Sequence, residues 1–578
     1  MRFVRIASII ALLCPGSQFI AQVFDLHIHS VNGNELDNLK YTRKFNSKEL
    51  AIAEVKQVLN KIRENGFLLT ETDSIIEKGS KITAYIKQGD QYKTGKIALG
   101  NLNPGLASKI GFFEKSQIEK PFKYKSIVKY INKIISHYEN NGFPFVSVTL
   151  DSVNISQNHI NAKWLVIPGK SYKIDSIQVI GNSSVSKKFL LKYLGLKEGM
   201  LYNESGIISI SQKCKQLPFI LEKQAPQTRL TEKNAKLRLF LDKKSASQFD
   251  GIVGLLPDAN TKKTVITGDV KLKIINGVFK SGETFDLEWR RLQSQTQDFK
   301  GKIIYPYMLG TPFGADYYLK IYRRDTTFID IHNNIGIQYY FKGLNNFKVF
   351  YKQRSSDLIS TNGLSFITTL PEYADIRTNS YGFGVLIEKV DYRFNPRKGI
   401  TLNLTSQAGT RNIRRNPKIN PLVYENTQLK SDQYQGEIEF NAYIPLKGVN
   451  IIHFGMQGAG IYATSSLFRN ELFRIGGFKT LRGFDEESIF TSAYVIPTIE
   501  YRLLFSQNSS LLLFIEGAWY ENNSTATYLT DTPVSAGAGI NFDTKAGILS
   551  LHYAVGNQFG NGFDIRSGKI HVGLTALF

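Results

Sequence analysis

Cysteine is scarce in this chain of 578 residues, which has only Cys14 and Cys214. Two Cys-x-x-Cys pairs are therefore impossible, and so is a disulfide framework. The eight histidines are scattered without a His-Glu-x-x-His motif, and no Gly-x-Ser-x-Gly motif occurs. Residues 89–96 are similar to a phosphate-binding loop, but the spacing is one residue too long and Ile97 replaces the required Ser or Thr. The sequence therefore predicts no enzyme, no metal site and no cofactor.

Long apolar runs are also missing. Beyond the first residues, no stretch of roughly 18 apolar residues could cross a membrane as a helix, and the mean hydropathy is -0.19. Any crossing of a membrane must therefore use strands.

Aromatic residues and positive charge are abundant. Aromatics make up 12% of the chain, and 72 Lys and Arg against 49 Asp and Glu give a formal net charge of +23. About 35 basic and 20 acidic residues fall within residues 22–248. This excess predicts attraction to anionic lipid headgroups or to an acidic partner. A soluble surface that is simply basic is the alternative.

The first residues have the order of an export signal. Arg2 and Arg5 precede the apolar stretch 6–14, and Phe19-Ile20-Ala21, which ends in a small residue, precedes Gln22. This order predicts a signal peptide over residues 1–21. The apolar core is too short for an anchor helix, and Leu13 stands where a lipoprotein site requires a small residue. We therefore expect the mature protein outside the cytoplasm, where nucleic acid is not an expected partner.

Helical and strand periodicities alternate from about residue 45 to residue 245 in units spaced by about 70 to 75 residues. In the first unit, Ser47 can cap a helix that Gly66 ends. Its expected buried face consists of Leu50, Val55, Val58, Leu59 and Ile62. The pattern predicts three copies of a small α+β module, at 22–100, 101–171 and 172–245.

The helical period disappears over residues 249–578. Short runs such as 400–404 and 569–576 place apolar residues on one face and polar residues on the other. A soluble sandwich and a transmembrane barrel both fit this alternation. The expected export, the aromatics and the terminal Phe578 in register with an apolar face favour an all-β antiparallel transmembrane barrel. At about 20 residues per strand and connection, it would have roughly 16 strands.

Residues 473–484 form a glycine-broken stretch with one arginine between apolar residues. Inside a barrel, that arginine would need a carboxylate partner, because an unpaired buried charge is costly. Gly483 would permit a sharp turn or a close approach to a wall. An ordinary surface loop is the alternative.

This stretch resembles the loop signature of the BamA/TamA superfamily of outer-membrane assembly proteins, which carry POTRA modules before a 16-stranded barrel. The matching residues are Gly476, Gly477, Leu481, Arg482, Gly483 and Phe484. The resemblance implies that the loop folds back into the lumen and that Arg482 contacts the inner wall. Residues 514–517 resemble the family's Phe-x-Asp-x-Gly strand, with Glu516 in place of Asp and the glycine one residue early. Glu516 is therefore the implied partner of Arg482.

Further matches surround this loop. Residues 391–399 resemble a strand-turn signature of the family, and Phe578 resembles its C-terminal barrel signal. The residues that carry the strand-turn resemblance are Asp391, Pro396 and Gly399. Those that resemble POTRA turns are Gly142, Pro144, Gly181 and Asn182. Three modules are most similar to the TamA branch, since BamA usually has five and two-partner secretion transporters usually have two.

The resemblance implies a bacterial outer-membrane protein with periplasmic modules that inserts β-barrel or surface proteins into the membrane. Clients would pair with exposed strand edges of the modules and with a weak seam between the first and last strands. Gly251, Gly254 and Gly573 would weaken that seam, or would only ease curvature. The implied partners are outer-membrane lipids, unfolded client proteins and a long periplasmic TamB-like protein. The alternative function is a secretion pore for one dedicated substrate.

Overall fold

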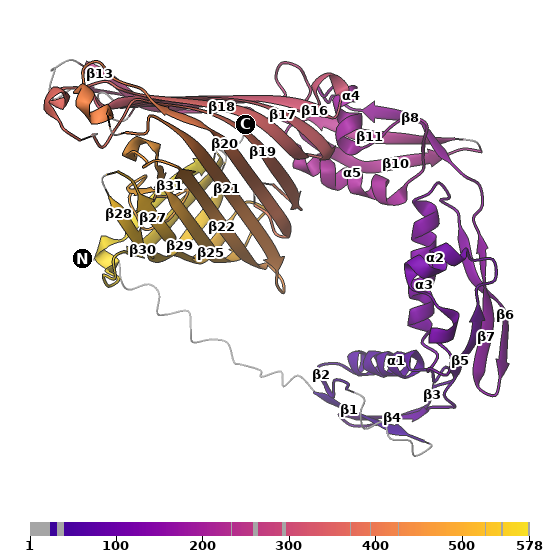
Figure 1. The fold of residues 1–578 in the computed structure, drawn as a ribbon. Helices are drawn as coiled ribbons and strands as arrows, with labels where there is room; N and C mark the ends of the chain where they lie inside the picture. Colours follow the sequence, from indigo (N-terminus) through magenta and orange to yellow (C-terminus); the bar gives the residue numbers. More distant parts are fainter. Residues whose placement is uncertain are drawn as a thin grey trace, which may run out of the picture. The chain divides into compact units, whose positions relative to one another are not determined.

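The structure is a computed structural model (Figure 1). It describes residues 23–31, 40–232, 234–257, 264–291, 296–369, 371–393, 395–425, 427–525, 527–544 and 547–575. The expected signal peptide, residues 1–21, and Phe578 lie outside the described residues. The chain divides into two compact units, Met1–Lys173 with Leu201–Ser205, and Ile174–Met200 with Gly206–Phe578. The first unit contains two small α+β modules, and the second contains most of a third module and a large sheet.

The first module is a four-stranded sheet with one helix packed against it. Its elements are β1 (Phe24–Ser30), β2 (Lys44–Phe45), α1 (Lys48–Glu64), β3 (Glu71–Lys78) and β4 (Lys81–Lys87), and the sheet order is β2-β1-β4-β3. Ser47 caps α1 by accepting a hydrogen bond from the Leu50 amide at 3.4 Å. Val55 packs on the sheet. The expectation that Leu50 lies on the buried face is wrong: its side chain is 54% exposed, because the helix turns Ala51 toward the sheet instead.

The second module has a three-stranded sheet of order β5-β7-β6. Its elements are β5 (Lys93–Ala98), α2 (Pro104–Ile110), η1 (Glu114–Ser116), α3 (Tyr124–Glu139), β6 (Ser147–Ser156) and β7 (His159–Ile167). Trp164 and Ile134 are buried at its centre. Because β5 pairs with β7 from Lys93 onward, the module boundary expected at residue 100 cuts through this sheet.

The third module has a sheet of order β10-β11-β8-β9. Its elements are β8 (Lys173–Ile180), α4 (Lys187–Leu194), β9 (Met200–Leu201), α5 (Glu204–Gln216), β10 (Ile220–Leu230) and β11 (Ala235–Lys243). Within the second unit, α4 packs on a connection of the large sheet: the rings of Phe189 and Tyr307 lie 5.7 Å apart. Gln216 of α5 also donates a hydrogen bond to the carbonyl of Val390 at 3.1 Å. Both contacts attach the third module to the large sheet.

The large sheet is antiparallel throughout, and its hydrogen-bonded order follows the chain. Its segments are β12 (Gln248–Pro257), β13 (Thr264–Ile275), β14 (Thr284–Arg291), β15 (Gln297–Tyr305), β16 (Phe313–Arg324), β17 (Phe328–Lys342), β18 (Asn345–Leu358), β19 (Ile376–Val390), β20 (Gly399–Ile413), β21 (Lys430–Pro445), β22 (Asn450–Ala463), β25 (Ala493–Leu504), β26 (Ser510–Gly517), β27 (Trp519–Asn523), β28 (Tyr528–Asp531), β29 (Val534–Thr544), β30 (Gly547–Asn557) and β31 (Lys569–Thr575). Four 3₁₀ turns lie in the connections: η2 (Met308–Gly310), η3 (Leu364–Phe366), η4 (Pro421–Tyr424) and η6 (Ile565–Ser567).

These 18 segments form sixteen strands within the described residues. β26 and β27 both pair with β25 and are separated only by Ala518, so they are one interrupted strand. β28 and β29 pair with β27 and β26 and form a second interrupted strand. The first and last strands of the order are β12 and β31.

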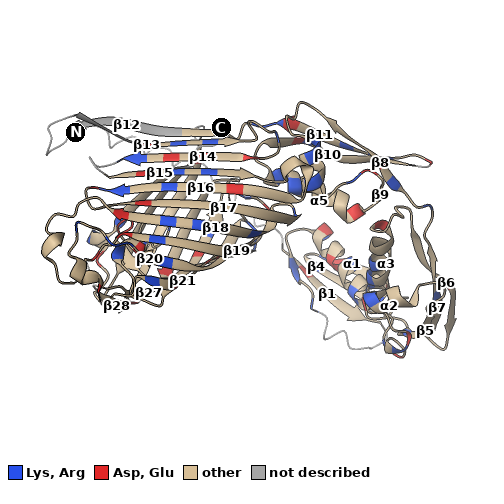
Figure 2. Ribbon diagram, turned by 45° about the horizontal axis from the view of Figure 1, so that its top comes forward, with Lys and Arg blue, Asp and Glu red and all other residues tan. Residues whose placement is uncertain are grey.

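The two faces of this sheet differ in polarity, as an outer-membrane barrel requires. On β17, Ile335 and Ile337 are 58% and 57% exposed, whereas Gln338 on the other face is buried. Charged residues recur along β14 to β19 (Figure 2), and Lys348 pairs with Asp316 at 2.7 Å on the inner face. Among the described residues, no helix is long and apolar enough to span a membrane. The fold class expected from the sequence is confirmed.

Candidate functional site: the loop in the barrel lumen

Residues 464–492 connect β22 to β25 and are called the lumen loop here. The loop contains η5 (Arg469–Glu471) and a hairpin of β23 (Phe473–Ile475) and β24 (Ile489–Thr491). Ile475 and Leu481 are fully buried, in a cluster with Tyr520 of β27 and Ile496 of β25. Phe484 joins the same cluster. The loop is therefore packed on the inner wall, and the alternative of an ordinary surface loop is excluded.

Glycines in left-handed conformations shape this loop. Gly476, Gly477 and Gly483 have φ angles of 109°, 96° and 88°, which other residues rarely adopt. A Cβ atom at Gly483 would lie 2.9 Å from the amide nitrogen of Gly556 on β30. The glycine therefore lets the loop approach the wall closely, and its amide donates a hydrogen bond to Nε2 of His571 at 3.1 Å.

Arg482 is held by two carboxylates of the inner wall. Its Nε atom donates to Glu516 on β26 at 2.8 Å, and its backbone amide donates to the same carboxylate at 2.8 Å. A third bond joins NH1 to Glu500 on β25 at 3.0 Å. The guanidinium also lies 3.5 Å from the ring centre of Phe514. The structure thus places Arg482 against Glu516, the partner implied by the resemblance, and adds Glu500.

The loop has a second attachment that its signature does not include. Arg411 on β20 is fully buried and forms a bidentate pair with Glu471, at 2.7 Å from Nε and 2.6 Å from NH2. Arg411 also donates to Ser465 Oγ at 2.7 Å, and the amide of Phe468 donates to Glu471 at 2.9 Å. Every nitrogen of the arginine side chain is therefore bonded.

Arg354 on β18 strengthens this second attachment. It donates to the carbonyls of Asn470 and Glu471 and pairs with Asp330 on β17 at 2.9 Å. The Asn470 side chain in turn donates to Ser356 Oγ at 2.8 Å. The lumen loop is thus fixed at two anchors, one on β17, β18 and β20 and the other on β25 and β26.

The two anchors are built in opposite ways. At Glu471 the loop supplies the carboxylate and the wall supplies the arginine, whereas at Arg482 the loop supplies the arginine and the wall supplies the carboxylates. Together they can fix a segment of chain across the lumen.

The strand-turn motif lies in the connection from β19 to β20. The carboxylate of Asp391 accepts hydrogen bonds from the amides of Arg397 and Lys398 at 2.9 and 3.1 Å. Gly399 has a φ of 119°, and Pro396 is buried. The motif therefore closes the tight turn between β19 and β20, whereas the lumen loop lies between β22 and β25.

The expected module turns are also turns in the structure. Gly142, with a φ of 100°, follows α3 and comes just before Pro144. Gly181 has a φ of 120°, and Asn182 accepts a hydrogen bond from the Lys243 amide at 2.9 Å. These residues shape the second and third modules and do not contribute to the lumen site.

Sequence reasoning missed Arg354, Arg411, Glu471 and Glu500. The three wall residues, Arg354, Arg411 and Glu500, lie in strands at positions where the alternation predicts an inward-facing side chain. This alternation was the signal that the sequence offered. Nothing in the sequence pairs Arg411 with Glu471 across 60 positions. Among the described residues, no group of three or more His, Cys, Asp or Glu is arranged to hold a metal ion.

The chain was compared with curated proteins, with solved structures and with models of protein families. No curated protein matches the chain. Among solved structures, BamA from Haemophilus ducreyi lacking POTRA domains 1–3 is 14% identical, with 83% of this chain and 98% of that chain covered and a TM-score of 0.42. CdiB from Acinetobacter baumannii is 15% identical, with 81% and 86% covered and a TM-score of 0.48. CdiB from Escherichia coli is 12% identical, with 89% and 96% covered and a TM-score of 0.49.

A family model described as the Omp85 superfamily domain matches residues 278–576, which is more than half of the chain. The match includes the lumen loop, both of its anchors and the strand-turn motif. The superfamily expected from the sequence is thereby confirmed, while the TamA branch stays a prediction. The chain belongs to the Omp85 superfamily and is an outer-membrane β-barrel protein.

Proposed function

We propose that this protein inserts β-barrel or surface proteins into the outer membrane. The observation that carries the proposal is the doubly anchored lumen loop. A loop held by buried arginine–carboxylate pairs on two parts of the wall obstructs the route through the lumen. Insertion between β12 and β31 leaves both anchors intact, because client strands pair with an open edge of the sheet. The client's own folding into lipid supplies the free energy, so no catalytic step is required.

The three modules lie in the periplasm in this proposal and receive unfolded clients. An extended client segment would add to an exposed strand edge, as in other strand-addition complexes. The basic balance of residues 22–248 supports contacts with anionic lipid headgroups. A long periplasmic TamB-like protein is the expected partner if the chain belongs to the TamA branch.

Depletion of the protein followed by proteomics of the outer membrane tests the proposal. We expect a broad loss of barrel proteins. The alternative function, export of one dedicated substrate through the lumen, predicts the loss of a single secreted protein. That result would overturn the insertion proposal.

A disulfide lock on the lumen loop separates the two routes directly. The side chains of Asn470 and Ser356 are hydrogen-bonded at 2.8 Å, so Asn470→Cys with Ser356→Cys would tie the loop to β18 in a Cys214→Ala background. Insertion at the seam should continue in the oxidised protein, whereas export through the lumen should stop until a reductant is added. Each single-cysteine variant is the matched control.

A further inference from the structure

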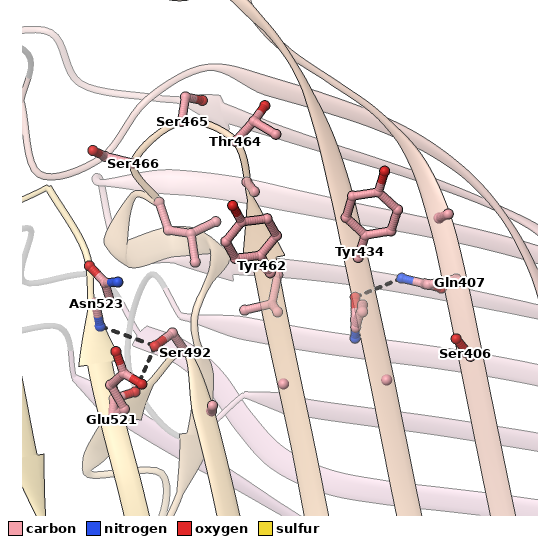
Figure 3. Close-up of a pocket in the computed structure, with 18 of the residues that line it drawn as sticks. Ser406, Gln407, Tyr434, Tyr462, Thr464, Ser465, Ser466, Ser492, Glu521 and Asn523 are labelled. Carbon is pink, nitrogen blue, oxygen red and sulfur yellow. Dashed lines mark hydrogen bonds between the residues drawn. The ribbon is translucent and has the colours of Figure 1, made fainter.

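A depression of about 750 Å³ lies on the barrel wall where β22 passes into the lumen loop (Figure 3). One row of cross-strand neighbours crosses it, from β19 to β27. The row consists of Phe383, Ser406, Gly436, Gly460, Ala493 and Glu521. Its four central residues are small, so the wall is thin there.

This row faces the lipid. Tyr434 and Tyr462 lie two residues from Gly436 and Gly460 on the same strands, and these tyrosines are 50% and 64% exposed. Side chains two residues apart in a strand point to the same face. The intervening Gln435 side chain bonds to Gln407 at 2.6 Å on the opposite face.

Neither glycine is required by the backbone or by packing. Both lack a positive φ. Among the described residues, a Cβ at Gly436 would meet nothing nearer than the Thr405 carbonyl at 3.9 Å, and one at Gly460 nothing nearer than Ala493 Cβ at 3.8 Å. Glycine inside a strand lowers its stability. These two glycines therefore serve to leave open space in the depression on the barrel wall.

The two sides of the depression differ in polarity. Toward the strand ends at Asn450 of β22 and Leu504 of β25, the next row is mostly apolar. It contains Leu404, Ile438, Gly458 and Val495. On the other side, Ser492 donates a hydrogen bond to the Glu521 carbonyl at 2.7 Å, and Tyr462 and Tyr434 follow on the neighbouring strands (Figure 3). An apolar side below a polar, tyrosine-rich side matches a lipid at the membrane–water interface.

Glu521 gives the polar side a negative charge. Within the described part of the chain, its carboxylate forms no ion pair. A carboxylate on a lipid-facing surface is costly unless a positive charge meets it.

We propose that this depression binds one membrane lipid, with an acyl chain over Gly436 and Gly460 and a positively charged amine of the headgroup at Glu521. The inference goes beyond the proposed function and does not depend on it. The back of the depression includes Ser465, which is bonded to Arg411 of the second anchor. The lipid would therefore lie against the base of the lumen loop.

Native mass spectrometry of the full-length protein in detergent tests this proposal, with phosphatidylethanolamine and phosphatidylglycerol as probes. We expect one phosphatidylethanolamine to be retained, with severalfold lower retention of the anionic phosphatidylglycerol. Gly436→Leu and Gly460→Leu should fill the space and reduce retention about tenfold. Glu521→Gln should remove the headgroup preference and keep part of the binding.

Ala538→Leu is the matched control, because Ala538 is an exposed small residue of β29 outside the depression. It should bind lipid like the wild type. Heat-dependent gel migration identifies variants that fail to fold, and Glu521→Gln provides a readout that does not change the shape of the wall. The proposal is overturned if the leucine variants retain lipid at the wild-type level, if the two lipids bind equally to the wild type, or if a second copy of the chain covers the depression.

Discussion

Arg482 illustrates how much a single buried charge depends on its partners. The residue is 7% exposed, and its guanidinium is enclosed by Glu500, Glu516 and the ring of Phe514. Because Glu500 also bonds to Arg502 at 2.5 Å, the carboxylates are shared among several donors. Removal of Arg482 leaves Glu516 without its guanidinium partner in a buried place.

We expect Arg482→Ala to destabilise the docked loop by about 3–5 kcal/mol, the usual cost of breaking a buried pair from one side. The heat-dependent gel shift should move to a lower temperature and insertion activity should fall, while export of the chain continues. Arg566→Ala, at an exposed position of η6, is the control. A wild-type transition temperature and activity for Arg482→Ala would contradict a structural contact in the lumen.

Cys214 is a second residue whose chemistry is set by burial. Burial of the side chain in α5, with a smaller effect from the charge of Glu222, raises the pKa of its thiol to about 12. At pH 8 only about one thiol in ten thousand is then ionised, and the thiolate is the reactive form. The unfolded thiol, with a pKa near ~8.5, ionises first as the pH rises, so this group disfavours folding above about pH 8.5.

A thiol reagent at pH 8 should therefore label the folded protein very slowly and the denatured protein at once. One equivalent per denatured chain is expected if residues 1–21 are removed, because Cys14 leaves with them. Two equivalents would contradict cleavage, and rapid labelling of the folded protein would contradict the burial of Cys214.

At the scale of an element, the lumen loop depends on the pair of Arg411 and Glu471. Both side chains are almost completely buried. A buried ion pair often contributes little net stability, but loss of one partner is severe. Substitutions of Arg411 and Glu471 therefore test the second anchor directly.

We expect Glu471→Gln and Arg411→Met to lower the transition temperature strongly as single changes, and the double variant to lose clearly less than the sum of the two. Thermal unfolding of all four proteins in one detergent gives the coupling free energy. Additive losses would indicate that the two side chains do not act as a pair.

The elements show where sequence reasoning succeeded and where it stopped. Alternation along runs such as 400–404 was sufficient to predict a sheet, because the pattern of period two is local. The strand number followed from the length of residues 249–578 at about 20 residues per strand and connection. Arg482 was found because its neighbours form a contiguous signature. Arg411 and Glu471 carry no local signature, since their contact depends on how far β20 is shifted against the start of the loop. Leu50 was misplaced because a first-turn position has no upstream helix turn to fix its face.

At the scale of the whole molecule, the barrel is expected to behave as a membrane protein. The exposed apolar side chains of strands such as β17 would meet water without detergent. The purified full-length chain should therefore precipitate without detergent, and in detergent it should migrate faster on a gel before boiling than after it. A detergent-free soluble monomer would contradict the barrel, and a boiled porin run beside it serves as the control.

The opposite polarity of the two anchors has a consequence for how the chain reaches its final form. If the loop entered the lumen the wrong way round, Arg482 would meet Arg354 and Arg411, while Glu471 would meet Glu500 and Glu516. Both encounters bring like charges together where water is scarce, and like-charge contacts of this kind cost several kcal/mol. The opposite charges of the two anchors therefore disfavour a reversed loop, and they leave one electrostatically favoured orientation for its entry into the lumen.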